Sequence, residues 1–128
     1  MRTLGQKRAE FAISRVLEIT QNMDEKKKKE FRSFSAGTPS MILQNGFGQT
    51  LAFWLSKRSD KHLAIFDMIV EWLSYDNGKD IRNTFATKKG RKEFMKELSE
   101  MDQSEYLTAQ KETLALLEWI KRFANADL

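Results

Sequence analysis

The sequence predicts an all-α fold, a compact single-domain bundle of about five to six helices. The chain has 128 residues, which is the length of one ordinary domain. One proline and six glycines leave little room for the many turns of an all-β protein. Apolar residues instead recur every three or four positions along most of the chain, which is the spacing of amphipathic helices.

Two helices are expected before the middle of the chain, at residues 3–23 and 24–34. Ser35–Gly37 provides the break that follows them. The second helix contains four consecutive lysines, which point in four directions and therefore do not form one stripe. They fit either a solvated face or a binding site. The first helix has an apolar stripe of Ala9, Ala12, Ile13, Val16 and Thr20.

The centre of the predicted bundle is a helix at about residues 39–57, which is apolar on nearly every side. A helix that is apolar all round belongs inside a globule. Thr38 is a candidate N-cap, and Pro39 fits the first helical position, where its missing N–H costs nothing.

Two glycines and three amides interrupt this central run. Gly46 and Gly48 each cost about 1 kcal/mol relative to alanine in a helix interior, which a close approach of another segment would offset. If Gln44, Asn45 and Gln49 are buried, their amides need hydrogen-bond partners in the core, in another subunit or in a ligand. The run is thus either a tightly packed core helix or one that carries a polar contact patch.

Three further helices are expected, at residues 61–75, 91–100 and about 105–125. Asp76–Asn77–Gly78 provides a glycine stop for the first, and Asp102 with Glu105 an N-terminal capping box for the last. Between them, Thr87–Lys92 forms a basic loop that could follow a nucleic-acid backbone or lie in solvent.

The distribution of charge is uneven. Residues 1–92 contain 18 basic and 10 acidic residues, whereas residues 93–128 contain 4 basic and 8 acidic residues. A basic body with an acidic end can bind a polyanion on one face, or can stack head to tail with further copies. An ordinary solvated surface is equally compatible with these numbers.

Composition argues against several classes of function. There is no cysteine, which excludes disulfides and cysteine-ligated metals. His62 is the only histidine, so neither a His/Cys metal site nor a complete catalytic triad can be assembled around it. Asp67 and Glu71 could share a divalent ion, but this spacing is common on exposed helix faces. We therefore predict a non-enzyme without cofactor or metal. With neither a signal peptide nor a membrane-spanning segment, it is expected in the cytoplasm.

Two motifs carry a resemblance to a known family. The run MILQNGFGQTLAFWLSK at residues 41–57 matches the pattern ILQNG-[LF]-G-Q-[ST]-L-A-F-x-x-SK. The run EYLTAQKETLALLEWIKRFANA at residues 105–126 contains Y-x-x-A-x-x-E-x-L-x-x-L-x-W-[LI]-K-R-F-A. Together, in this order and behind a basic N-terminal helix, they resemble the small subunit of type III-B CRISPR effector (Cmr) complexes.

The resemblance implies a non-catalytic RNA-binding structural subunit that acts in antiviral defence. Copies of it would stack beside the backbone and large subunits along guide RNA paired with target RNA. The RNA-facing candidates are Lys7, Arg8, Arg15, Lys57, Lys61, Lys121 and Arg122, of which only Lys57, Lys121 and Arg122 fall within the motifs. The candidates for motif or subunit contacts are Gln44, Asn45, Gly46, Gly48, Gln49, Trp72 and Trp119.

The main alternative is a helical protein–protein adaptor without direct nucleic-acid contact. Trp72, Trp119 and the acidic C-terminal end would then form its docking surface. A DNA-binding helix-turn-helix regulator is disfavoured, because the segment after Gly37 is apolar rather than a polar recognition helix.

Overall fold

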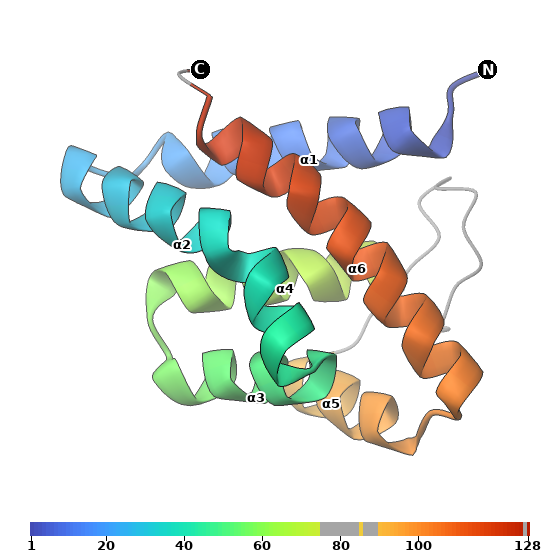
Figure 1. Ribbon diagram of the computed structural model, residues 1–128. Coiled ribbons are helices and arrows are strands. Elements are labelled where there is room, and N and C mark those ends of the chain that lie inside the picture. Colours follow the sequence, from blue (N-terminus) through green and yellow to red (C-terminus); the bar gives the residue numbers. More distant parts are fainter. Residues whose placement is uncertain (75–84, 86–89, 127) are drawn as a thin grey trace.

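The computed structural model describes residues 1–74, 85, 90–126 and 128, and these residues form six helices and no strand (Figure 1). The predicted all-α fold is therefore confirmed. In chain order the helices are α1 (Leu4–Thr20), α2 (Glu25–Asn45), α3 (Phe47–Lys57), α4 (Asp60–Ser74), α5 (Arg91–Glu100) and α6 (Gln103–Ala124).

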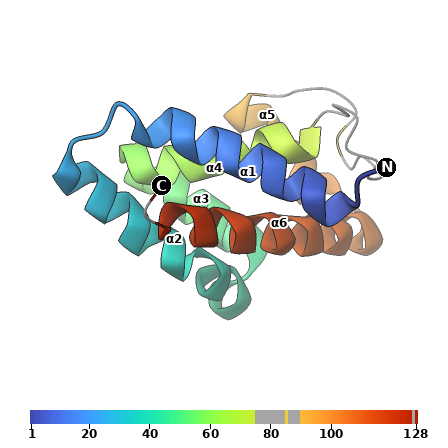
Figure 2. The ribbon, with the colours of Figure 1, turned by 90° about the horizontal axis from the view of Figure 1, so that it is seen from above.

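The longest helix, α6, crosses the molecule and packs against both α1 and α2. Viewed from above, α1 and α6 lie side by side and run in the same direction, whereas α2 runs against α6 (Figure 2). Helices α3 and α5 lie at the other side of the bundle (Figure 1). The first and last helices are thus neighbours, which closes the fold.

Helix α4 occupies the centre of the fold, in place of the predicted helix at residues 39–57. It packs against each of the other five helices in the described part of the chain. More than half of its residues are buried, because its apolar side chains cover a wide arc of the helix: Ile65, Phe66, Met68, Ile69, Val70, Trp72 and Leu73, with Ser74 at its end.

The predicted helix at residues 39–57 is in fact two helices that meet at Gly46. This glycine adopts φ 91° and ψ 153°, and it both ends α2 and precedes the first residue of α3. Only glycine adopts this backbone region readily, so the helix cannot continue through it. Conversely, α2 runs without interruption through Ser35–Gly37, where a break was predicted.

Local hydroxyl groups explain why α2 continues past Pro39. A proline has no N–H, so the carbonyl of Ser35 lacks its normal helical donor. The hydroxyl of Thr38 donates to that carbonyl at 2.9 Å, and the hydroxyl of Ser35 donates to the carbonyl of Phe31 at 2.7 Å. Thr38 is therefore a buried residue inside α2 and not the predicted N-cap.

The remaining predicted helices agree with the structure to within a few residues. Thr3 caps α1 in a reciprocal capping box with Gln6, and the Asp102 side chain accepts from the Glu105 N–H at 2.9 Å at the start of α6. The predicted stop at Asp76–Asn77–Gly78 and residues 87–89 of the predicted basic loop lie outside the described residues.

Gly46, at the junction of α2 and α3, and Gly37, inside α2, allow a matched test. We expect Gly46→Ala to lower the free energy of unfolding by about 1–3 kcal/mol, because alanine is strained at φ 91°. Gly37→Ala, inside α2, should raise it by up to about 1 kcal/mol, because the new methyl would lie 3.7 Å from Met41 Cε in ordinary contact. Urea denaturation followed by circular dichroism measures both. Equal stability of the two variants would contradict the break at Gly46.

Candidate nucleic-acid interface

Arg8 is part of a half-buried ion pair that joins three helices. Its Nε–H and Nη2–H groups donate to the two carboxylate oxygens of Glu112 at 2.6 and 2.7 Å. The same carboxylate accepts from Trp72 Nε1 at 2.9 Å, so α1, α4 and α6 meet at Glu112. The hydrogen bonds from Arg8 to Glu112 raise the pKa of Arg8, despite opposing burial. Arg8 therefore joins three helices, and its predicted contact with RNA stays a prediction.

Arg15 is engaged in the same way on the next turns of α1. It donates to both carboxylate oxygens of Glu71 in α4, pairs with Glu18 at 3.4 Å and stands 4.9 Å from the centre of the Phe11 ring. Hydrogen bonding to Glu71 raises the pKa of Arg15. Lys7, on the same helix, is half-buried. The α1 cations predicted to face RNA thus include two that hold the helices together.

The predicted cations Lys57 and Lys61 lie in a different setting, at the tight turn between α3 and α4. Arg58 adopts a left-handed conformation (φ 56°) that ends α3, and α4 begins two residues later. Lys27, near the start of α2, reaches the same turn and lies 3.8 Å from the carboxylate of Asp60. We call Lys27, Lys57, Arg58 and Lys61 the basic corner.

The cations of the basic corner are largely unneutralised. Lys57, Arg58 and Lys61 form no ion pair with any residue that the structure describes. Lys57 stands 5.2 Å from the centre of the Phe53 ring, which is 52% exposed. Asp60, paired with Lys27, contributes one negative charge against four positive ones. The corner can therefore hold anions.

Burial and the positive charges of the basic corner affect the pKa of His62. Its ring packs on Phe34 with centroids 4.4 Å apart, and its Nδ1 shares a hydrogen bond with the hydroxyl of Ser59. Burial lowers the pKa of His62, and the positive charges of Lys61 and Lys57 lower it further. The two lysines therefore act on the same small region of the surface.

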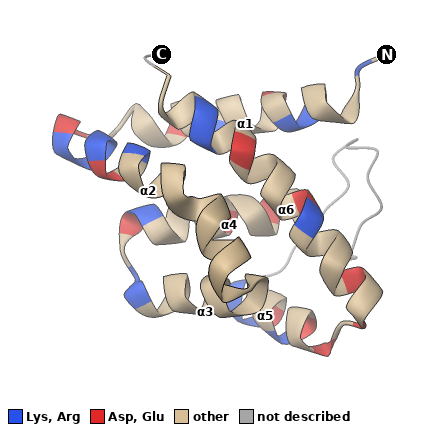
Figure 3. Ribbon diagram, in the orientation of Figure 1, with Lys and Arg blue, Asp and Glu red and all other residues tan. Residues whose placement is uncertain are grey.

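Lys121 and Arg122 lie in the last turn of α6, and neither forms an ion pair with a described residue. Just beyond them, the Asn125 side chain donates to the carbonyl of Arg32 at 3.2 Å, which fixes this end of α6 beside α2. The end of α6, the start of α2 and the basic corner lie towards the same side of the molecule (Figure 3). Acidic residues gather at the opposite side, where α5 meets α6, and we call them the acidic corner: Glu93, Glu97, Glu100, Asp102 and Glu105.

The motif residues surround the junction of α2 and α3. Gln44, Asn45 and Gln49 are exposed, which favours the polar contact patch over a role of their amides in the core. Gly48 does meet the predicted close approach, although from a side chain. Its N–H donates to the hydroxyl of Tyr106 at 2.9 Å, and a methyl group at this position would lie 3.4 Å from that oxygen.

The two tryptophans predicted as subunit contacts differ in accessibility. Trp72 is 2% exposed and packs on Phe11 with ring centroids 5.1 Å apart, so it belongs to the core and cannot form a docking surface. This burial corrects the prediction, and it follows from the wide apolar arc of α4. Trp119 is 37% exposed and stacks on Phe123 at 5.6 Å, which leaves it available to a partner.

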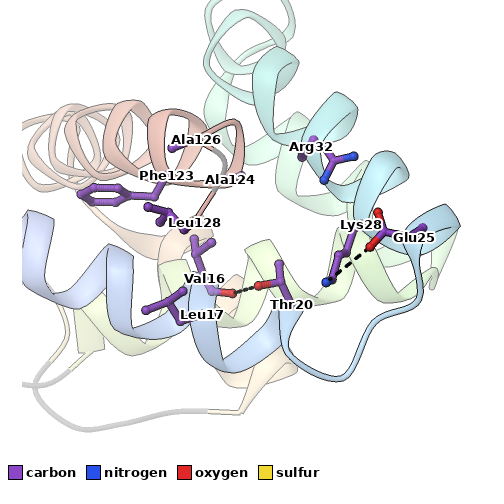
Figure 4. A pocket seen from close by; sticks show the side chains of 10 residues that line it. All are labelled: Val16, Leu17, Thr20, Glu25, Lys28, Arg32, Phe123, Ala124, Ala126 and Leu128. Atoms are coloured by element: carbon purple, nitrogen blue, oxygen red, sulfur yellow. Dashed lines mark hydrogen bonds and ion pairs between the residues drawn. The ribbon is translucent and has the colours of Figure 1, made fainter.

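Two of the cavities on the described surface contain residues of the lysine run or of the first motif. One lies between the ends of α1, α2 and α6 and includes Lys28, which pairs with Glu25 at 3.7 Å (Figure 4). Its volume of about 110 Å³ suits a few water molecules, at roughly 30 Å³ each, rather than a nucleotide. The other, at the junction of α2 and α3, has a volume of about 590 Å³.

The described residues offer no grouping of three or more His, Asp or Glu side chains with which to hold a metal ion. Asp67 and Glu71, whose spacing could suit a divalent ion, are bound instead to Arg91 and Arg15. None of the described helices combines the length and apolar character needed to cross a membrane.

Sequence reasoning missed two members of the basic corner, Lys27 and Arg58. In the lysine run, Lys28 lines the small cavity (Figure 4). Lys27 is distinguished by its contact with Asp60, which follows from how α2 packs on α4.

The shared ion pair at Glu112 gives a stability prediction. We expect Glu112→Ala to lower the free energy of unfolding by about 2–3 kcal/mol, because it removes the carboxylate that accepts from the half-buried Arg8 and from Trp72 Nε1. Glu100→Ala is the control, since Glu100 pairs with Lys96 in solvent and should cost under about 0.5 kcal/mol. Guanidinium denaturation measures both. Similar losses would show that Glu112 does not organise the three helices.

His62 gives a pH prediction. Because its pKa is lower in the folded chain than its ordinary value of 6.5, the unfolded chain binds more protons below that pH. The stability contributed by neutral His62 is present above pH 6.5 and is lost as the pH falls through the folded pKa. We expect His62→Gln to remove the loss of stability that begins as the pH falls below 6.5. Parallel curves of unfolding free energy against pH for the two proteins would contradict the prediction.

Comparisons with known proteins agree with the resemblance in the motifs. Residues 4–127 match the family described as "CRISPR-associated protein (Cas_Cmr5)". The "CRISPR system Cmr subunit Cmr5" of Thermus thermophilus is 30% identical over 126 residues, which cover 98% of this chain and 96% of that protein. The crystal structure of a "CRISPR-associated Cmr5 family protein" from the same organism superposes with a TM-score of 0.73 at 28% identity, covering 97% of this chain and 96% of that one. Since the match spans nearly the whole chain, this protein belongs to the Cmr5 family of CRISPR-associated proteins.

Proposed function

We propose that this chain is a non-catalytic, RNA-binding structural subunit of a type III-B CRISPR (Cmr) effector complex, acting in antiviral defence in the cytoplasm. Membership of the Cmr5 family supports its place among the Cmr subunits. The observation that carries RNA binding is the set of cations at the basic corner that pair with no described carboxylate.

These cations suit a phosphate backbone. Lysine and arginine side chains that neutralise phosphates give affinity without reading base sequence. Lys57, Arg58 and Lys61 lie at one turn, and Lys121 and Arg122 add positive charge in the last turn of α6, towards the same side. A guide RNA paired with its target RNA would lie along this side.

A single copy would bind RNA weakly, because few phosphates are neutralised by one corner. Several copies held along one strand would combine their contacts and bind strongly. The separation of a basic side from an acidic corner between α5 and α6 supports such stacking, since opposite charges of successive copies attract each other. Backbone and large subunits of the complex would fix the spacing.

The state of the titratable groups supports a non-catalytic role. His62 has a lowered pKa and shares a hydrogen bond with Ser59. Asp67 holds Arg91 through two hydrogen bonds of 2.8 and 2.9 Å, and Glu71 holds Arg15. These groups are engaged in packing the helices, so cleavage of RNA would be the task of other subunits.

A protein–protein adaptor is the second candidate. The exposed stack of Trp119 on Phe123 favours it, because partly exposed tryptophans are frequent anchors of protein interfaces. In this case the subunit would contact only other proteins of the complex.

Removal of two cations from the basic corner separates these candidates. In the assembled complex, we expect Lys57→Ala with Lys61→Ala to weaken binding of target RNA. The slope of log affinity against log salt should fall by about 1.4, at about 0.7 for each lost phosphate contact. Filter binding at several salt concentrations measures both quantities.

The matched control is Lys96→Ala with Lys111→Ala, which removes the same charge from α5 and α6 outside the basic corner and should leave the slope unchanged. If the variant complex assembles normally and binds RNA with the wild-type affinity and slope, the adaptor is the correct function.

A further inference from the structure

We propose that the junction of α2 and α3 holds a binding site for one unstacked RNA base. This inference deepens the proposed function and rests on it, because a phosphate contact alone would not use this cavity. The site, which we call the motif groove, is lined by Met41, Asn45, Gln49, Thr50 and Phe53. Its volume of about 590 Å³ lies within the roughly 300–1,000 Å³ of small-molecule sites.

The polar groups of the motif groove suit the edge of a base. Asn45 is the last residue of α2 and Gln49 lies in the first turn of α3, and the break at Gly46 brings both to one cavity. Both side chains are exposed, and neither amide forms a hydrogen bond with a described residue. An amide offers a donor and an acceptor side by side, which is the pattern that pairs with a base edge.

The apolar part of the motif groove suits the face of a base. The Phe53 ring is 52% exposed, and aromatic rings of this kind stack with bases of any sequence. Lys57 Nζ stands 5.2 Å from the centre of the same ring. A nucleotide whose base lies on Phe53 therefore has a cation of the basic corner within reach of its phosphate.

The backbone that carries the motif groove is held in place by hydrogen bonds within the chain. The hydroxyl of Thr50 donates to the carbonyl of Met41 at 3.1 Å, which ties α3 to α2. The Gly48 N–H donates to the hydroxyl of Tyr106 in α6. A backbone held in this way loses less entropy on binding, which favours the binding of even a single base.

The charge of the surrounding chain favours a nucleotide over a basic segment of a partner protein. No acidic residue occurs between Glu30 and Asp60, so the helices that form the groove carry no carboxylate next to it in sequence. Lys57, whose ammonium lies against the Phe53 ring, is positive. Phosphate is attracted to such a site, whereas a lysine or arginine of a partner is repelled.

Nuclear magnetic resonance of the full chain can test the site with small probes. We expect the four nucleoside 5′-monophosphates to shift the side-chain amide signals of Asn45 and Gln49 and the ring signals of Phe53. Ribose 5-phosphate, which lacks a base, should shift only signals of the basic corner. Phe53→Ala should weaken the base-dependent binding at least about fivefold, the lower limit for loss of one stacked base.

Leu43→Ala is the control, because Leu43 is 69% exposed near the same junction and does not line the groove. It should bind the monophosphates as the wild type does. The dispersion of the amide spectrum checks that both variants remain folded.

Three outcomes would overturn the inference. One is that monophosphates and ribose 5-phosphate give the same shifts, and another is that Phe53→Ala binds like the wild type. The third is protection of the groove from hydrogen exchange in a complex assembled without RNA, which would assign it to a protein partner. In the first two cases, signals of the basic corner that still shift would support the proposed contact with the phosphate backbone of RNA.

Discussion

The carboxylate of Glu112 is the constraint around which the helices are arranged. It is largely buried, with 13% of the side chain exposed, and a charge in that position must be compensated. Arg8 from α1 supplies the opposite charge and Trp72 from α4 supplies a further donor. Because Glu112 itself belongs to α6, one group fixes where the first, central and last helices meet. Trp72 is thereby committed to the core, which leaves Trp119 as the accessible tryptophan of the C-terminal motif.

The cations of this chain therefore serve two different purposes. Arg8 and Arg15 lie where α1 packs on its neighbours, and each meets a carboxylate from a helix far away in sequence. Lys57 and Lys61 lie at a turn, where the chain reverses direction and no described helix covers them with acidic partners. Packing surfaces require neutral pairs, since an unpaired buried charge is costly, whereas a turn can leave charge unpaired in water. Position in the fold, and not residue type, separates the cations that join helices from those proposed to meet RNA.

The difference between local signals and contacts made by distant residues explains how much of the fold could be predicted from the sequence alone. The all-α fold and the bounds of α1, α5 and α6 depend on local spacing and caps, and they were predicted well. The segment at residues 39–57 failed because Pro39 was taken as a helix start and Gly46 as a tolerated interior residue. The Thr38 hydroxyl allows the helix to continue past Pro39, and the positive φ of Gly46 ends it. The partners of Arg8 and Arg15, 104 and 56 positions away, have no local signal at all.

The bend at Gly46 also gives a physical reason for the length of the first motif. A straight helix over residues 39–57 would place Asn45 and Gln49 one turn apart on a single surface, with no cavity between them. The bend instead brings both to a groove that also includes Phe53, and Lys57 Nζ lies 5.2 Å from the centre of that ring. Gly48, Thr50 and Tyr106 hold the bend in place. The motif from Asn45 to Lys57 thus contains the residues of a bend, of a groove and of a nearby cation. A substitution of Gly46 at the bend would alter the shape of the groove, although Gly46 does not line it.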